Sequence, residues 1–539
     1  MQRMDSSPPR PTVAEQLVAR LRTHGVRNVF GYPGGQLLPI YDALYHEPAI
    51  RHVLARDEQA AAFMADGYAR ATGKPGVCLA VCGPGVLNAA TPLASSFTDS
   101  IPVLLISGQV PTAGIGLRSG YYHENDQLAA VASITKQRAR VAQPADLDAA
   151  VDAAFTALSG GRPGPAFLES PLDILRAEGT PSVPSPESSA ALTPSTQEIA
   201  ALAALLTMWK RPLLLAGGGV LSAGAAPMLV QLAERLGAPV FTTAMGKGVI
   251  PGDHPLSAGV PWRRATSDVS NMASYFSPLF TEADGLLALA CRFSQLTTGT
   301  WCMPLPTNIV HIDVDASEIG RHYPVTLGIH ADARAALTAL LATLPDSPRT
   351  RWAKLPPPAE PWMLPGIDLA GPLRRALPRD AIVVADITRL AYILLAEFPV
   401  YEPRTFLHPA GSVAMGYGIP AALGAKTAFP DRPVVAIVGD GCFLMSGMEL
   451  ATAIQEDLPI VIVLVNDSCL SLIKLTQERR YESRFLAVDL RNPDFALFAK
   501  AFGAYYWRVN TKEAFSAALA EALRVTKVSL IEVILNDKA

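Results

Sequence analysis

Two acidic residues in the last third of the chain have the setting of a cation site. Asp440, within Gly439-Asp440-Gly441, follows one apolar run, and Asp467 follows the next. In an open parallel sheet, ligands collect at the carboxyl ends of the strands, where these two carboxylates can share one cation. Mg²⁺ prefers such hard oxygen ligands and commonly bridges carboxylates to phosphates. The glycines let the backbone approach a diphosphate, and the helix expected at Met448–Gln455 offers free N–H groups to it.

A single Gly-Asp-Gly is more often only a turn, so the second carboxylate carries the prediction. The whole pattern, from Gly439-Asp440-Gly441 to Asn466-Asp467, resembles the signature of the thiamine-diphosphate enzymes. The resemblance implies that the side chains of Asp440 and Asp467, with a backbone carbonyl near Cys469, bind Mg²⁺. It also implies cofactor contacts at Gly441 and Cys442. Many relatives carry Asn in place of Asp467, and we expect the added negative charge to tighten Mg²⁺ binding.

The segment Gly411–Lys426 resembles the part of this family that holds the aminopyrimidine of the cofactor. There Met415 takes the place of the apolar wedge that folds the two cofactor rings together, and the backbone at Val413 and Met415 is implied to bond the pyrimidine. By itself Met415 would be an ordinary core methionine. Thr388 and Arg389 lie where relatives carry a Gln-His pair at the diphosphate.

The first third of the chain resembles the family's glutamate helix at Arg56–Arg70, which begins with Asp57 and Glu58. A generic interpretation makes both residues first-turn acids that complement a helix dipole. The resemblance implies instead that Glu58 hydrogen-bonds the pyrimidine ring and starts the proton exchange that activates the cofactor. Further first-domain landmarks are Gly31–Gln36, Cys82–Asn88 and Gly161–Pro165.

Two other residues of the first third are implied to approach the reacting centre. Gly35 brings its backbone near it. His123 falls where acetohydroxyacid synthases have a Gln, and an imidazole there can shuttle a proton or orient an acceptor. A histidine of an ordinary surface loop is the equal alternative.

The resemblance is nearest to the acetolactate (acetohydroxyacid) synthase large subunits, with departures at the acceptor site. Thr476 replaces their substrate-contacting Trp, and Ser294-Gln-Leu296 replaces their Asp-Asp-Arg. Loss of that arginine removes a carboxylate clamp, so an acceptor other than a second 2-oxo acid becomes an alternative. Leu472 and Ile473 are candidates for the substrate pocket, with core packing as the other interpretation. FAD binding stays open, since Gly217-Gly-Gly219 lacks the GxGxxG spacing.

Apolar runs that end in Gly, Asn or Asp alternate with Ala- and Leu-rich helical segments, as at Val103–Gly108 and Val434–Asp440. Such continuous apolar strands are typical of parallel sheets covered on both faces, so we predict an α/β fold of three doubly wound parallel-sheet domains. The Pro-rich stretches Gly179–Ser195 and Pro345–Pro365 predict linkers. The predicted domains are a pyrimidine-binding domain with the activating Glu at 1–178, a middle domain at 196–344 and a diphosphate- and Mg²⁺-binding domain at 366–539. Similar patterns at Gly85–Gly108 and Gly441–Asp467 suggest related folds at the two ends, although any two βαβ units look alike.

The overall composition limits the classes of binding partner that we expect. A net charge of −3 over 539 residues argues against nucleic acid and membrane surfaces, and six cysteines without CxxC spacing suggest a reducing cytoplasm. The family resemblance implies a homodimer or homotetramer with active sites at the subunit interface.

The predicted function is thiamine-diphosphate- and Mg²⁺-dependent decarboxylation of a 2-oxo acid, with pyruvate as the default donor and an acyl transfer to an acceptor. The alternatives are a 2-oxo acid decarboxylase, a carboligase with a different acceptor, a non-catalytic paralogue and, more distantly, a flavin-dependent oxidoreductase.

Overall fold

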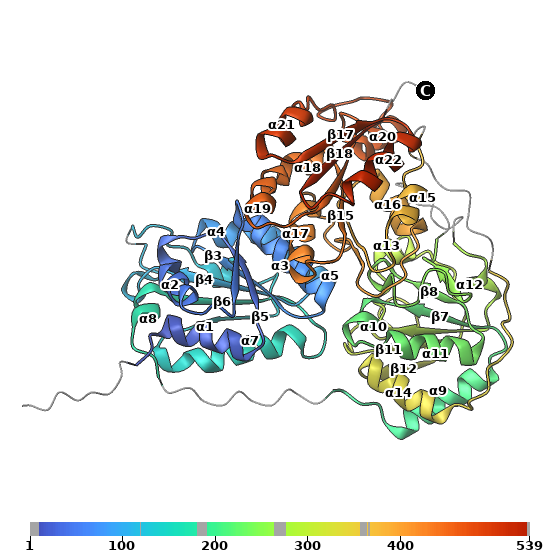
Figure 1. Cartoon of the computed structure of the whole chain (residues 1–539). Helices are drawn as coiled ribbons and strands as arrows, with labels where there is room; N and C mark the ends of the chain where they lie inside the picture. The colour runs from blue at the N-terminus through green and yellow to red at the C-terminus, as the bar shows by residue number, and fades with distance from the viewer. Residues whose placement is uncertain are drawn as a thin grey trace, which may run out of the picture. The chain divides into compact units, whose positions relative to one another are not determined.

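Three parallel sheets of six strands each, flanked by helices, make up the described part of the protein (Figure 1). The computed structural model describes residues 10–118, 120–180, 191–262, 276–355, 364 and 367–535. The predicted fold class is thereby confirmed. Most of the first predicted linker, 181–190, and residues 356–363 and 365–366 of the second lie outside the described residues. The exact domain boundaries stay predictions.

The first sheet has the strand order β2-β1-β3-β4-β6-β5. Its strands are β1 (Asn28–Gly31), β2 (Arg51–Leu54), β3 (Gly76–Ala80), β4 (Val103–Gln109), β5 (Gln137–Arg140) and β6 (Ala166–Pro171). The helices are α1 (Val13–Thr23), α2 (Leu38–Tyr45), α3 (Glu58–Thr72), α4 (Pro84–Asn88), α5 (Ala90–Asp99), α6 (Gln127–Ala130), α7 (Leu147–Ser159) and α8 (Leu172–Arg176). Every residue of β3 and β4 is buried, as continuous apolar runs require.

The middle sheet has the order β12-β11-β10-β7-β8-β9. Its strands are β7 (Pro212–Ala216), β8 (Val240–Thr242), β9 (Ser257–Gly259), β10 (Gly285–Leu289), β11 (Ile309–Asp313) and β12 (Leu327–His330). The helices are α9 (Thr196–Met208), α10 (Gly218–Ser222), α11 (Ala226–Leu236), α12 (Leu279–Glu282), α13 (Gln295–Thr298) and α14 (Ala333–Thr343). This is the strand order of dinucleotide-binding folds. A Cβ on Gly217 would meet the Ala290 carbonyl oxygen at 1.9 Å, so this glycine serves close packing of the turn after β7.

The third sheet has the order β14-β13-β15-β16-β18-β17. Its strands are β13 (Ile382–Ala385), β14 (Phe406–Leu407), β15 (Val434–Gly439), β16 (Val461–Asn466), β17 (Tyr505–Val509) and β18 (Ser529–Ile534). The helices are α15 (Ala370–Ala376), α16 (Arg389–Glu397), α17 (Gly418–Ala428), α18 (Asp440–Ser446), α19 (Leu450–Gln455), α20 (Ser471–Arg480), α21 (Phe495–Phe502) and α22 (Lys512–Ala522). Counted along its own part of the chain, this sheet repeats the order of the first sheet, which supports the related folds expected at the two ends.

The helix expected at Met448–Gln455 is present as a 3-10 turn and α19, and a separate helix that was not predicted, α18, precedes it. Gly439 is extended, with φ −87° and ψ 164°, and α18 starts directly at Asp440. A 3-10 turn at Gly447–Glu449 then leads into α19. Asp440 therefore stands in a first helical turn, where the helix dipole favours a negative charge.

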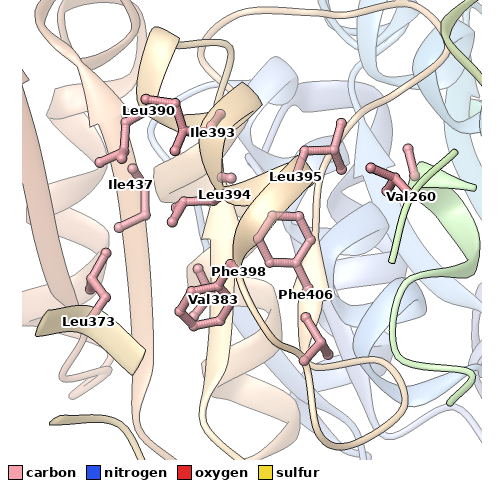
Figure 2. Packing of buried hydrophobic residues seen from close by; sticks show 14 of the residues in the cluster. Val260, Leu373, Val383, Leu390, Ile393, Leu394, Leu395, Phe398, Phe406 and Ile437 are labelled. Carbon is pink, nitrogen blue, oxygen red and sulfur yellow. The ribbon is translucent and has the colours of Figure 1, made fainter. Parts of the chain in front are cut away.

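The described chain forms two compact units, residues 10–69 with 74–180 and residues 70–73 with 191–535. The middle and third sheets belong together because one apolar cluster includes side chains of both, such as Val260 of the middle part and Val383 and Ile437 of the third (Figure 2). Three leucines of α16 also point into this cluster: Leu390, Leu394 and Leu395. Each buried leucine contributes roughly 1.5–3 kcal/mol, so α16 is held firmly.

Over the described ranges, helices are all too short or too polar to cross a lipid bilayer. All six cysteines are free thiols, five of them buried and Cys302 exposed.

Candidate active site

A cavity of about 150 Å³ opens at the carboxyl ends of β13, β15 and β16. It brings together most of the residues predicted for the cofactor, the metal and the substrate in the third part. These lining residues are Thr388, Arg389, Met415, Asp440, Gly441, Cys442, Asp467, Cys469, Leu472 and Ile473. The segments that supply them lie far apart in the sequence and meet because each follows a parallel strand or begins the helix after it.

Asp440 and Asp467 both face this cavity and lack a cationic hydrogen-bond partner in the described chain. Burial raises the pKa of Asp440, and burial together with the charge of Asp440 raises the pKa of Asp467. A cation shared by the buried Asp440 and the partly buried Asp467 would relieve the repulsion between the two carboxylates. Asn492 bonds Asp440 Oδ2 through its amide nitrogen at 2.7 Å, while its own Oδ1 is buried without a hydrogen-bond partner in the described part.

This donor set fits Mg²⁺. Nowhere in the described ranges do three or more His, Cys, Asp or Glu side chains form a metal-binding group, so the carboxylates supply only part of a coordination sphere. Mg²⁺ commonly takes one or two carboxylates and completes its octahedron with phosphate oxygens and water. Zinc, which uses three or four nitrogen and sulfur ligands, would find no such set here.

The N-terminus of α16 lies at the same cavity. The Thr388 hydroxyl oxygen caps it by accepting from the Ala391 N–H at 2.9 Å, and Arg389 is its first residue. Burial dominates the raised pKa of Asp467, but the Arg389 charge opposes it, so the guanidinium acts electrostatically on the carboxylate. A helix N-terminus with an arginine suits an anionic diphosphate.

Asp386, which was not among the predicted site residues, links Ile387, which lines the cavity, to the start of α17. Its Oδ2 accepts from the N–H of Gly418 and its Oδ1 from the N–H of Ile387, each at 2.7 Å. The first bond fixes the start of α17 and hence the path of the chain through Met415. Burial raises the pKa of Asp386 to about 6.

Two predicted residues are not brought to the cavity. Val413 is 38% exposed and has a left-handed φ of 52°, a strained conformation for a β-branched residue. Thr476 donates its hydroxyl back to the Leu472 carbonyl at 2.9 Å and does not line the cavity. Leu470 and Ser471 line it instead, because they begin α20 directly after Asp467 and Cys469.

The first unit holds Glu58 at the start of α3, 8% exposed. Asp57 caps this helix by accepting from the Ala60 N–H at 2.7 Å, so Glu58 is free of that role. The Asn88 amide donates to Glu58 Oε2 at 3.1 Å, and a Cβ on Gly85 would lie 2.9 Å from Glu58 Oε1. Asn88 is a partner that sequence reasoning had included only within a landmark segment.

The turn after β3 connects the three predicted residues of this unit. A Cβ on Gly34, the neighbour of Gly35, would meet Val81, and a Cβ on Gly83 would meet the His123 carbonyl oxygen at 2.7 Å. Gly35 itself faces open space, and His123 is exposed with a left-handed φ of 67°. Glu58, Gly35 and His123 therefore surround one turn at the carboxyl edge of the first sheet.

Comparison with known proteins identifies the class. Three family models of the thiamine pyrophosphate enzymes match the chain: the N-terminal thiamine pyrophosphate binding domain at residues 11–130, the central domain at 199–340 and the C-terminal binding domain at 386–533. The chain belongs to the thiamine pyrophosphate enzyme family.

Several relatives match along nearly their whole length. The acetolactate synthase large subunit of Parasynechococcus marenigrum is 36% identical, covering 96% of this chain and 87% of that protein. A Pseudomonas aeruginosa protein described as a probable 2-ketoarginine decarboxylase is also 36% identical, covering 97% and 93%. The thiamine diphosphate-dependent 4-hydroxybenzoylformate decarboxylase of Rhodococcus jostii superposes with a TM-score of 0.85 at 26% identity, covering 98% and 100%.

Proposed function

We propose that the protein binds thiamine diphosphate and Mg²⁺ in the cavity of the third sheet and decarboxylates a 2-oxo acid, pyruvate first, with transfer of the acyl unit to an acceptor. The observation that carries this proposal is the pair of carboxylates, the buried Asp440 and the partly buried Asp467, in one cavity with Met415. Similarity to acetolactate synthase large subunits supports the choice of donor.

Each part of the cavity has a task in this proposal. Asp440, Asp467 and the Cys469 carbonyl would hold Mg²⁺, while Arg389 and the N-termini of α16 and α18 would hold the diphosphate. Met415 would support the folded cofactor from below. When bound, the cofactor supplies a carbon nucleophile and an electron sink for the loss of CO₂. Leu472 and Ile473 form an apolar wall that would exclude water and confine the substrate side chain.

Glu58 is proposed as the acid–base group that exchanges a proton with the pyrimidine ring. Its carboxylate is nearly enclosed, and among the described residues Asn88 alone donates to it, which leaves its other oxygen for a ligand. General acid–base groups contribute typically 10²–10⁴-fold in rate. His123, on an exposed loop of the same edge, is proposed to move or hold a proton at the acceptor.

A homodimer or homotetramer, with Glu58 of one subunit serving the cavity of another, completes the proposal. Apolar side chains remain exposed on α4 and α5 of the first unit and, separately, on α18 and the following 3-10 turn of the second, and each set is available for an interface with another subunit. The residues are Leu87, Phe97, Leu444, Met445 and Met448. Six free cysteines suit a reducing compartment, so the cytoplasm is the proposed location. FAD is not part of the proposal.

The first experiment follows CO₂ release and products from purified protein with thiamine diphosphate, Mg²⁺ and pyruvate. We expect acetolactate from the wild type and a loss of at least about 10²-fold for Glu58→Gln. Asp57→Asn, which neutralises the neighbouring acid and keeps a capping oxygen, is the matched control and should retain activity. Activity of Glu58→Gln equal to that of the control would remove Glu58 from the mechanism.

A complementation experiment tests the shared site. Glu58→Gln and Asp440→Ala are expected to be inactive separately. If each active site uses Glu58 of one subunit and Asp440 of the other, remixed subunits recover about a quarter of the wild-type activity, since half of the dimers then carry one intact site. No recovery after proven subunit exchange would place both residues in a site within one subunit.

The second candidate is decarboxylation of a larger 2-oxo acid without carboligation. It is favoured by the similarity to the 2-ketoarginine and 4-hydroxybenzoylformate decarboxylases and by Thr476 and Leu296 at the acceptor positions. If the wild type binds the cofactor but leaves pyruvate untouched, 2-ketoarginine and 4-hydroxybenzoylformate are the next substrates.

A further inference from the structure

A buried glutamate stands at the same register in the first and third sheets. Glu169 of β6 pairs with Ser107 of β4, and Glu532 of β18 pairs with Leu464 of β16. In both sheets an amide residue ends the neighbouring strand two positions later, Gln109 in β4 and Asn466 in β16.

The contacts of the two glutamates repeat as well. Gln109 donates its amide to Glu169 at 3.3 Å, and Asn466 donates to Glu532 Oε1 at 2.6 Å. An arginine of the adjacent edge strand lies directly opposite each glutamate in the ladder, Arg140 in β5 and Arg508 in β17. Both guanidiniums form ion pairs with their glutamate.

In each sheet one more side-chain amide connects these residues to the segment that directly follows a central strand, β3 in the first sheet and β15 in the third. In the first sheet, Gln127 donates to Glu169 at 2.6 Å and accepts from the Gly83 N–H at 2.9 Å. In the third sheet, Asn492 donates to Asn466 Oδ1 at 3.0 Å and to Asp440 Oδ2 at 2.7 Å. Gly83 belongs to the turn beside Glu58, and Asp440 is the proposed metal ligand.

In the third sheet, the donor and acceptor chemistry fixes the direction of every hydrogen bond in the series that runs from Glu532 through Asn466 and Asn492 to Asp440. A carboxylate only accepts, so Glu532 requires the amide nitrogen of Asn466 to face it. The oxygen of Asn466 then points the other way and accepts from Asn492 and from the Ser468 N–H at 3.1 Å. Asn492 must in turn present its nitrogen, whose two hydrogens serve Asn466 and Asp440.

We propose that Glu532, through Asn466 and Asn492, is a positioning residue that orients the Asp440 carboxylate for Mg²⁺. This inference rests on the proposed cofactor site and adds the residues that hold its metal ligand in position. Groups that hold a metal ligand in place typically change metal affinity by 10–100-fold when removed. Glu532 lies 66 residues from Asn466, so only the strand register connects them.

The test measures the Mg²⁺ dissociation constant of the full-length protein by calorimetry at saturating thiamine diphosphate, together with the melting temperature. Asn492→Ala removes the donor to Asp440, and Glu532→Leu removes the acceptor for Asn466. We expect each to weaken Mg²⁺ binding at least about tenfold. The double variant should bind Mg²⁺ no more weakly than the weaker-binding of the two single variants, because both substitutions interrupt the same series of hydrogen bonds.

Two further variants separate positioning from stability. Glu532→Gln keeps an oxygen toward Asn466, since the Tyr506 hydroxyl that now donates to Glu532 can turn and accept from the new amide. It should restore near wild-type Mg²⁺ affinity. Thr511→Ala removes the cap of α22, where the Thr511 hydroxyl accepts from the Ala514 N–H, and is expected to destabilise the same domain by about 1 kcal/mol. It leaves the hydrogen bonds between Glu532 and Asp440 unchanged.

The outcomes are distinguishable. Wild-type protein that binds neither Mg²⁺ nor thiamine diphosphate would overturn the proposed function and this inference together. Wild-type binding with an unchanged Mg²⁺ constant in Asn492→Ala would overturn the inference alone. If Thr511→Ala weakens Mg²⁺ binding as much as Asn492→Ala does, the loss is an effect of stability, and the inference is overturned as well.

Discussion

At the scale of single residues, the environment of Glu58 depends on the absence of a side chain at Gly85. A Cβ there would lie 2.9 Å from Glu58 Oε1 and 2.9 Å from Val81, closer than real Cβ contacts. We expect Gly85→Ala to displace the carboxylate and to lower turnover by roughly 10- to 100-fold with little change in melting temperature, because small misplacements of a reacting group are costly.

Gly164→Ala is the control for this prediction in the same unit. Its Cβ would make ordinary contacts with Lys136, at 3.6 Å and beyond, so activity and stability should stay near wild type. Comparable turnover of the two variants would show that Gly85 does not set the position of Glu58.

Asp386 predicts a pH dependence of stability. Its pKa of about 6 in the folded protein exceeds the ordinary value of 3.8, so the folded state binds the proton more tightly than the unfolded chain. The stabilisation of the folded state by this tighter proton binding is therefore full below pH 3.8, falls as the pH rises and is lost above about pH 6. The change in the free energy of unfolding is about 3 kcal/mol, at 1.36 kcal/mol per pKa unit.

Asp386→Asn cannot ionise and loses one acceptor, so it should be less stable than the wild type at pH 4, with a deficit that shrinks by pH 7. Urea unfolding of both proteins at intermediate pH values measures this difference. A deficit that grows with pH would mean that the folded pKa of Asp386 is lowered.

Residue types with a fixed local spacing could be predicted from the sequence, and residues joined only by strand register could not. Asp440 and Asp467 each follow an apolar run, and the cavity contains both. Asn492 and Glu532 carry no local signal, because their partners are 52 and 66 residues away. Thr476 was placed by analogy with a Trp, but it lies one helical turn beyond Leu472 and bonds that residue's carbonyl.

At the scale of elements, α20 and α17 differ in how they are held. Helix α17 is almost wholly buried, whereas α20 has no buried residue and is tied by surface contacts such as Lys474–Asp489 at 2.8 Å. Local opening is easiest where few apolar contacts must break.

We therefore expect the amides of α20 to exchange with deuterium at least about tenfold faster than those of α17. Thiamine diphosphate with Mg²⁺ should slow exchange in α20, since Ser471, Leu472 and Ile473 line the cavity. Mass spectrometry of peptides from both helices, with and without the cofactor, tests this. Equal protection in the free protein would contradict it.

Strands were easier to predict than helix starts. The continuous apolar runs that begin at Val103 and Val434 are buried strands, as predicted, whereas Asp440 looked like a loop residue and proved to be the first residue of α18. The order of strands within a sheet depends on which helical crossover packs on which face, and no local pattern records that choice. Only the shared order of the first and third sheets had a counterpart in the repeated sequence pattern.

At the scale of the whole molecule, the shared core makes the middle and third sheets one cooperative unit. Leu394 of α16 belongs to a cluster that includes Leu213 of β7 and Leu286 of β10. Leu394→Ala should cost about 2–5 kcal/mol through the cavity that it leaves.

The same substitution should speed sub-global hydrogen exchange in β7 and β10 as well as in β13. Exchange measured strand by strand in wild type and variant distinguishes one unit from two. Acceleration confined to β13, β15 and β16 would mean that the two sheets unfold independently.

The exposure of a single cysteine has a practical consequence. A thiol-reactive fluorophore added to the native protein should attach at Cys302, because the other five thiols are buried. Cys302 follows α13 in the middle part and does not line the cavity of the third sheet. The unmodified sequence therefore provides one specific labelling point per chain, suited to counting subunits by single-molecule photobleaching and to following subunit exchange in real time.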